Sequence, residues 1–100
     1  MLSNIVYTLD QIRNILYPVF KEHNVNKALL FGSYVKGMAR AESDIDIVVD
    51  SGLRGLSFYG LLEDIVNSLD KRVDLLDVTQ ITPESEIDKE IKRTGVLIYG

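Results

Sequence analysis

Two aspartates, Asp44 and Asp46, stand two residues apart in the stretch Asp-Ile-Asp-Ile, and this spacing could hold a metal ion. Successive side chains of a β-strand point to opposite faces of its sheet. Both carboxylates would therefore project from one face while Ile45 and Ile47 enter the core. Two neighbouring anions repel each other unless a cation lies between them. Mg²⁺ suits such a position because it commonly binds one or two carboxylates together with substrate phosphates. The alternative is that the pair lines a solvent-exposed face of the sheet.

Gly32 and Ser33 form a second element that could take part in chemistry. They end the apolar run Ala28–Phe31 and open a short helical turn at 33–36, for which Ser33 is the expected cap. The first backbone N–H groups of such a turn point outward and can bind phosphate. Glycine lets the backbone approach closely, and the serine hydroxyl adds a donor. A simple cap is the alternative, but with two carboxylates on the next strand the pattern predicts a phosphate site beside a metal site.

At this point the chain resembles a known family. Residues 30–37 (Leu-Phe-Gly-Ser-Tyr-Val-Lys-Gly) and 43–47 (Ser-Asp-Ile-Asp-Ile) are similar to the GSxxxGx(n)SDxD signature of the DNA-polymerase-β-like nucleotidyltransferases. The short length makes the chain resemble the minimal nucleotidyltransferase (MNT) proteins, which are the antitoxin half of HEPN–MNT toxin–antitoxin pairs. The resemblance spans nearly the whole chain, and the combined motif is specific.

The resemblance implies a third carboxylate between apolar residues on a later strand, and Asp74 fits this description. Asp77 is the rival, but in a regular strand it lies on the opposite face from Asp74. In the family mechanism, Asp44, Asp46 and Asp74 hold two Mg²⁺ ions. One ion carries the triphosphate of ATP, and the other lowers the pKa of the acceptor hydroxyl. Asp74 is also the candidate general base.

The family pattern also assigns the nucleotide phosphates. Gly32 and Ser33 would hold the β- and γ-phosphates of ATP, and pyrophosphate would leave. Many relatives have Ala-Arg where this chain has Val35-Lys36, which keeps a cation but loses its two-pronged contact to phosphate. Arg40 is a second candidate contact in the loop that follows. For Lys36 and Arg40, a phosphate contact and a solvated surface position are equally open.

The length and net charge of the chain restrict which kinds of molecule can accept the nucleotide. One hundred residues suffice for a single domain over 1–100, and a net charge of −4 argues against nucleic-acid or anionic-membrane binding. There is no signal-peptide pattern, and no segment approaches the roughly 20 apolar residues of a membrane span, so a cytoplasmic protein is expected. The chain has no cysteine, which excludes disulfides and thiolate zinc sites.

The resemblance implies that the group that accepts the nucleotide belongs to a partner protein. In the pairs that this chain resembles, the MNT protein transfers AMP from ATP to a tyrosine hydroxyl of the HEPN toxin and blocks its RNase site. We therefore expect adenylylation of a cognate HEPN toxin, with the chain in a homo-oligomer or in a hetero-oligomer with that toxin. Two alternatives stay open: an antitoxin that neutralises by binding alone, and a small-molecule nucleotidyltransferase with its acceptor site between subunits.

The elements that must position these residues follow from the apolar patterns. Short apolar or alternating runs predict four strands, at 28–31, 44–50, 72–78 and 96–99. Helices alternate with them, which predicts an α/β (α+β) domain. Its mixed sheet of about four strands is flanked by helices, and by resemblance it is of the nucleotidyltransferase type.

Three helices are expected around this sheet. Thr8 opens the first through a capping box, Pro18 either kinks or restarts it, and His23 lies in its solvated last turn. Ser57 is the expected cap of the second. The third is expected to start at Thr82-Pro83, with proline in the first helical position.

Overall fold

The computed structural model describes residues 4–100 and confirms the α/β prediction. Its elements are, in chain order, α1 (Leu9–Glu22), β1 (Lys27–Phe31), the 3₁₀ turn η1 (Gly32–Tyr34), β2 (Ile45–Asp50), α2 (Leu56–Leu69), β3 (Val73–Asp77), the 3₁₀ turn η2 (Val78–Gln80), α3 (Glu86–Thr94) and β4 (Val96–Tyr99). All of the expected helices and strands are present, with shifts at several ends.

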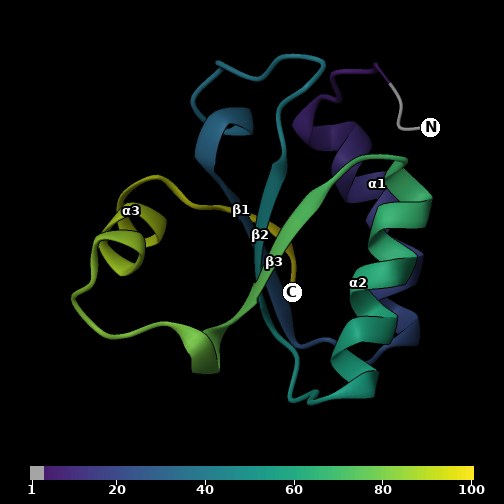
Figure 1. Ribbon diagram of the computed structural model, residues 1–100, viewed down its shortest axis with the longest axis vertical. Coiled ribbons are helices and arrows are strands. Elements are labelled where there is room, and N and C mark those ends of the chain that lie inside the picture. The colour runs from purple at the N-terminus through teal and green to yellow at the C-terminus, as the bar shows by residue number, and fades with distance from the viewer. Residues whose placement is uncertain (1–3) are drawn as a thin grey trace.

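The four strands form one mixed sheet in the order β3-β2-β1-β4. β1 is antiparallel to both β2 and β4, whereas β2 and β3 are parallel. α1 and α2 pack side by side on one face of the sheet, and α3 lies on the other (Figure 1). The crossover from β2 through α2 to β3 is what makes the parallel pair possible, because parallel strands need a long connection.

The main core lies between the sheet and the α1–α2 pair. Each of these helices contributes one apolar stripe at helical spacing, and β1 and β2 contribute alternate residues. The fully buried apolar side chains of this layer are Ile12, Leu16, Phe20, Ala28, Leu30, Ile45, Ile47, Val49, Leu61, Ile65 and Leu69. The alternation leaves Asp46 on the other face of β2, toward α3.

The start of α1 is as expected. The Thr8 side chain accepts a hydrogen bond from the Gln11 N–H at 3.1 Å, and the Gln11 side chain accepts one from the Thr8 N–H at 2.8 Å. Pro18 lies inside one uninterrupted helix, so a restart at this residue is wrong. The helix has an apolar face that packs on the core, and this packing tolerates one missing backbone hydrogen bond.

The predicted starts of the other two helices are wrong. α2 begins at Leu56 with Gly55 as its N-cap, and no side chain caps it. α3 begins at Glu86, with Ser85 rather than Thr82 as its N-cap, because the Ser85 hydroxyl accepts the Asp88 N–H at 3.2 Å. Pro83 lies in the turn before this helix, where the Ser85 N–H donates to the Thr82 carbonyl.

His23 is not a freely solvated residue. Its Nε2 lies 2.7 Å from Asp64 Oδ2 on α2, so it links the end of α1 to the neighbouring helix. The expectation failed because the pairing of the two helices brings together residues far apart in the sequence. Within residues 4–100, no helix combines the length and apolar character needed to cross a membrane.

Candidate active site

Two parallel strands bring Asp46 and Asp74 side by side. In the register of β2 and β3, Asp46 is the partner of Asp74, and both are near the starts of their strands. Asp44 is exposed and lies directly before β2. The buried Ile45 and Ile47 face α1 and α2, so Asp46 faces away from the main core. The three carboxylates predicted from the sequence therefore lie at one end of one face of the sheet.

Gly32 lies against Asp46 from the next strand. β1 ends where Phe31 pairs with Asp46, and Gly32 then turns the chain with φ +77°. A Cβ atom on Gly32 would overlap Oδ2 of Asp46 and lie 3.0 Å from its Cγ. Only glycine fits this position without displacing the carboxylate, because left-handed backbone and close approach are both required.

The turn after Gly32 is shorter than expected. η1 covers Gly32–Tyr34, and its N-cap is Phe31 without a side-chain hydrogen bond, so the assignment of Ser33 as cap is wrong. The N–H groups of Val35 and Lys36 both donate to the Gly32 carbonyl, at 3.1 and 3.2 Å. From this tight turn, the charge of Lys36 acts on Asp46.

The surroundings of Asp46 raise its proton affinity. The pKa of Asp46 is raised from 3.8 to about 6. Burial is the largest cause, repulsion from Asp74, Asp44 and Glu90 adds to it, and Lys36 opposes it. The site thus presents oxygen donors and negative charge that its own cation does not balance, which suits a hard divalent cation such as Mg²⁺. Among residues 4–100, no group of three or more His, Cys, Asp or Glu side chains already forms a metal cluster.

Glu90 is the member of this site that the sequence analysis missed. It extends from α3 with its Oε2 3.6 Å from Nζ of Lys36, and its charge acts on Asp46. A signal was available, because Glu90 follows Ile87 by three residues and precedes Ile91, which places it on the sheet-facing side of the helix. What could not be read from that spacing is which part of the sheet the helix covers.

The other predicted residues lie in different surroundings. Arg40 is exposed, and its backbone N–H donates to Ser43 Oγ at 2.9 Å. Unlike Lys36, it is not among the charges that shift the pKa of Asp46. Tyr34 is 6% exposed and packs in the core, and burial raises its pKa. Its hydroxyl is the one buried side-chain polar atom without a hydrogen-bond partner in the described part of the chain.

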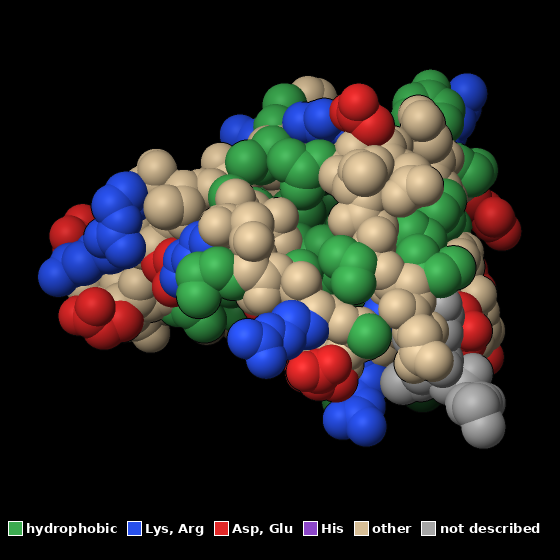
Figure 2. Space-filling view, turned by 90° about the horizontal axis from the view of Figure 1, so that it is seen from above, with side chains coloured by type: hydrophobic (Ala, Val, Ile, Leu, Met, Phe, Trp, Pro, Cys, Tyr) green, Lys and Arg blue, Asp and Glu red, His purple; other side chains and the backbone are tan. Residues whose placement is uncertain are grey.

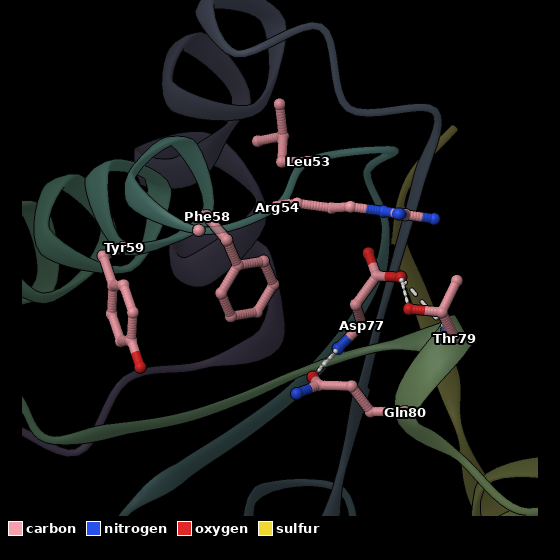
Figure 3. A pocket seen from close by; sticks show the side chains of 8 residues that line it. Leu53, Arg54, Phe58, Tyr59, Asp77, Thr79 and Gln80 are labelled. Atoms are coloured by element: carbon pink, nitrogen blue, oxygen red, sulfur yellow. Dashed lines mark hydrogen bonds between the residues drawn. The ribbon is translucent and has the colours of Figure 1, made fainter.

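Asp77, the rival of Asp74, lies at the opposite end of β3 and on the core side. It is 4% exposed, and both carboxylate oxygens accept hydrogen bonds: Oδ1 from the hydroxyl and N–H of Ser51, Oδ2 from those of Thr79. Burial alone would raise the pKa of Asp77, but these bonds outweigh it and lower that pKa. Figure 3 shows this carboxylate turned toward Thr79 in a cavity of about 440 Å³ that Arg54 and Phe58 also line. The structure thus groups Asp74, and not Asp77, with Asp46.

The family profile described as "Polymerase beta, Nucleotidyltransferase" matches residues 12–100, which include all of the site residues named above. The chain belongs to this nucleotidyltransferase family. A relative in Thermococcus cleftensis, the protein adenylyltransferase MntA, is 36% identical to it over 97 residues, which are 91% of this chain and 96% of the relative.

Solved structures show the same fold. A chain of a toxin–antitoxin crystal structure with AMP-PNP superposes with a TM-score of 0.75 at 25% identity, over 88% of this chain and 73% of that chain. A chain from the complex of a tri-AMPylated Shewanella oneidensis HEPN toxin with its MNT antitoxin superposes with a TM-score of 0.70 at 22% identity, over 93% of this chain and 73% of that chain. Together with the family profile and the MntA relative, the fold match confirms the resemblance to minimal nucleotidyltransferases.

Proposed function

We propose that this nucleotidyltransferase transfers AMP from ATP to a tyrosine hydroxyl of a HEPN toxin and thereby neutralises it. The observation that carries the proposal is the junction of Gly32 with Asp46, beside Asp74 and Asp44. The name of the T. cleftensis relative, protein adenylyltransferase, the AMP-PNP complex and the tri-AMPylated toxin support the choice of AMP and of a HEPN toxin as the acceptor protein. The choice of a tyrosine rests on the resemblance to the HEPN–MNT pairs. We expect the reaction to take place in the cytoplasm, within a complex of the two proteins.

Each part of the site has a role in this reaction. Asp44, Asp46 and Asp74 would hold the Mg²⁺ ions, for which their all-oxygen donor set is suited. When bound, Mg²⁺ neutralises developing charge on the phosphates and lowers the pKa of the acceptor hydroxyl. The backbone and hydroxyl of Gly32 and Ser33 bind the β- and γ-phosphates.

The transfer itself is an in-line displacement. The acceptor oxygen attacks the α-phosphorus of ATP, a new P–O bond forms, and the bond to the pyrophosphate oxygen breaks. Asp74 receives the hydroxyl proton, and pyrophosphate leaves with the bonding electron pair. Because the AMP that has been transferred carries ribose hydroxyls, the product can itself serve as an acceptor, and we propose that more than one AMP is added.

Lys36 and Arg40 differ in how well they are placed to contact a phosphate of the nucleotide. Lys36 is within ion-pair distance of Glu90 and acts electrostatically on Asp46, so it is close enough to exchange Glu90 for a phosphate. Arg40 is exposed and is not among the charges that act on Asp46. We therefore propose Lys36 as the phosphate contact in preference to Arg40.

The test is co-expression with the protein encoded by the adjoining reading frame, followed by intact-mass spectrometry of that protein. The wild-type chain is expected to add the mass of AMP, whereas Asp44→Asn and Asp46→Asn add none. Asp50→Asn is the matched control, because Asp50 is an exposed aspartate at the far end of β2. Undiminished transfer by the Asp44→Asn, Asp46→Asn double variant refutes the catalytic proposal. Neutralisation without any mass change instead supports an antitoxin that acts by binding.

A further inference from the structure

Arg72 lies directly before β3, on the side of the site away from Gly32. The Ile45 N–H donates to the Arg72 carbonyl at 3.0 Å, which continues the β2–β3 pairing by one step beyond the strands. Residues two apart share a face, so Arg72 is placed on the side of the sheet that carries Asp74. Arg72 and Asp44 also line one cavity of about 190 Å³ beside the carboxylates.

Among the described residues, Arg72 is the cation of this cavity whose side chain has no partner. Within residues 4–100, its guanidinium makes no ion pair or hydrogen bond with a side chain or backbone group. The neighbouring Lys71 is different, since it is 2% exposed and donates from Nζ to the Ala41 carbonyl at 2.7 Å. Lys71 therefore holds the loop before Asp44 in place, whereas the guanidinium of Arg72 has no anionic partner among residues 4–100.

The end of the molecule that carries the site has scattered basic side chains, so a single arginine there can contribute strongly to anion binding. Seen from the end of the molecule in Figure 2, Lys and Arg side chains stand singly or beside Asp and Glu rather than in a continuous basic surface. An anion that approaches the site therefore depends on individual cations. Lys36 is one of these on the β1 side, and Arg72 is one on the β3 side.

The in-line geometry of the displacement determines which side of the site binds the leaving phosphates of ATP and which side binds the acceptor. In the proposed reaction, Gly32 and Ser33 hold the leaving phosphates at the end of β1. An in-line attack places the acceptor opposite to the leaving pyrophosphate. In the strand order β3-β2-β1, the opposite side is that of β3, which is an edge strand and open to a partner. Arg72 thus lies on the acceptor side.

We propose that Arg72 binds the phosphodiester of an AMP unit already attached to the acceptor and so promotes the second and later transfers. This inference rests on the proposed function. In the second transfer, a ribose hydroxyl of the attached AMP attacks the α-phosphorus of a new ATP. Its proton passes to Asp74, and pyrophosphate leaves with the electron pair. The attacking hydroxyl now has a phosphodiester anion close by, and a guanidinium can bind two of its oxygens at once. A tyrosine acceptor has no such anion.

The experiment is a time course of transfer to the co-expressed and purified partner, with each AMP addition resolved by intact-mass spectrometry. Arg72→Gln is expected to slow the second addition about tenfold or more relative to the first, the size of one lost charge-assisted contact. Arg72→Lys is expected to recover part of the second rate, because it keeps the charge without the two-pronged geometry. Arg54→Gln is the matched control, because it removes the same charge at the opposite end of β3.

The outcomes separate the two proposals. If the wild-type chain adds no AMP, the proposed function is wrong, and the role of Arg72 in extension is wrong with it. If the wild-type and Arg72→Gln chains extend the acceptor at the same rate, only the assignment of Arg72 is overturned. An equal loss in the first and second additions also overturns it, because Arg72 would then contact the partner rather than the attached AMP. The Arg72→Lys variant decides the question if Arg72→Gln does not fold.

Discussion

Replacing Gly32 with alanine gives the most direct test of how the site is built. The new Cβ would overlap Oδ2 of Asp46 and lie 3.0 Å from its Cγ, so the carboxylate has to move by on the order of 1 Å. A displacement of this size in a catalytic group can reduce the rate about 100-fold. The left-handed φ of +77° adds about 1–2 kcal/mol of strain for a residue with a Cβ. We expect Gly32→Ala to lose AMP transfer about 100-fold and to unfold at a temperature lower by roughly 4–16 °C.

Gly52→Ala is the matched control for this experiment. Gly52 lies after the far end of β2 and has φ +69°, almost the same backbone conformation, but a Cβ atom added there would meet nothing within 4 Å. Both variants should therefore lose similar stability in thermal unfolding, while only Gly32→Ala loses transfer in an assay of labelled AMP incorporation. If both variants keep equal activity, or lose it equally, the contact of Gly32 with Asp46 does not matter for catalysis and the reasoning is wrong.

Three further predictions concern stability. Asp77→Asn should lower the free energy of unfolding by about 1–3 kcal/mol at neutral pH, because it removes the carboxylate that accepts hydrogen bonds from Ser51 and Thr79. Since the folded pKa of Asp77 is depressed, that stability is present above about pH 3.9 and is lost as the pH falls through the folded value. In urea unfolding, the difference in the free energy of unfolding between Asp77→Asn and wild type should become smaller as the pH falls from 7 to 2. Thr8→Ala should cost about 0.5–2 kcal/mol through loss of the N-cap, with Thr8→Ser close to wild type in the same assay. Asp46→Asn should raise the unfolding temperature above pH 6 without added metal, because burial and neighbouring carboxylates disfavour the ionised side chain, and the gain should vanish below about pH 4. A lower unfolding temperature for this variant at pH 8 would show that Asp46 has a structural role.

The carboxylate arrangement could be predicted from local rules. Strand alternation alone places Asp46 opposite to Ile45 and Ile47, and the same rule separates Asp74 from Asp77. The capping box at Thr8 is equally local, since its partners are three residues apart. In each case the controlling interaction lies within a few residues, which is why the sequence pattern is sufficient.

Features that depend on packing between distant segments could not be predicted. Glu90 reaches the site only because α3 crosses the sheet near β1, and His23 meets Asp64 only because α1 packs on α2. The start of α3 was misplaced for a related reason. Pro83 is acceptable in a first helical turn, but the chain uses it in the preceding bend, where Glu84 has φ +65° and its N–H donates to Asp88 Oδ2 at 2.9 Å.

The two ends of the β2–β3 pair differ in a way that itself indicates function. At one end, the buried Asp77 has hydrogen-bond donors on both oxygens, and its lowered pKa shows that the fold favours its charge. At the other end, Gly32 is in a left-handed conformation against Asp46, whose raised pKa shows that the fold disfavours its charge. A chain selected for stability alone would not keep a carboxylate whose charge the fold disfavours next to a position that only glycine fits. Their concentration at Gly32 and Asp46 is expected where a ligand that carries positive charge completes the structure.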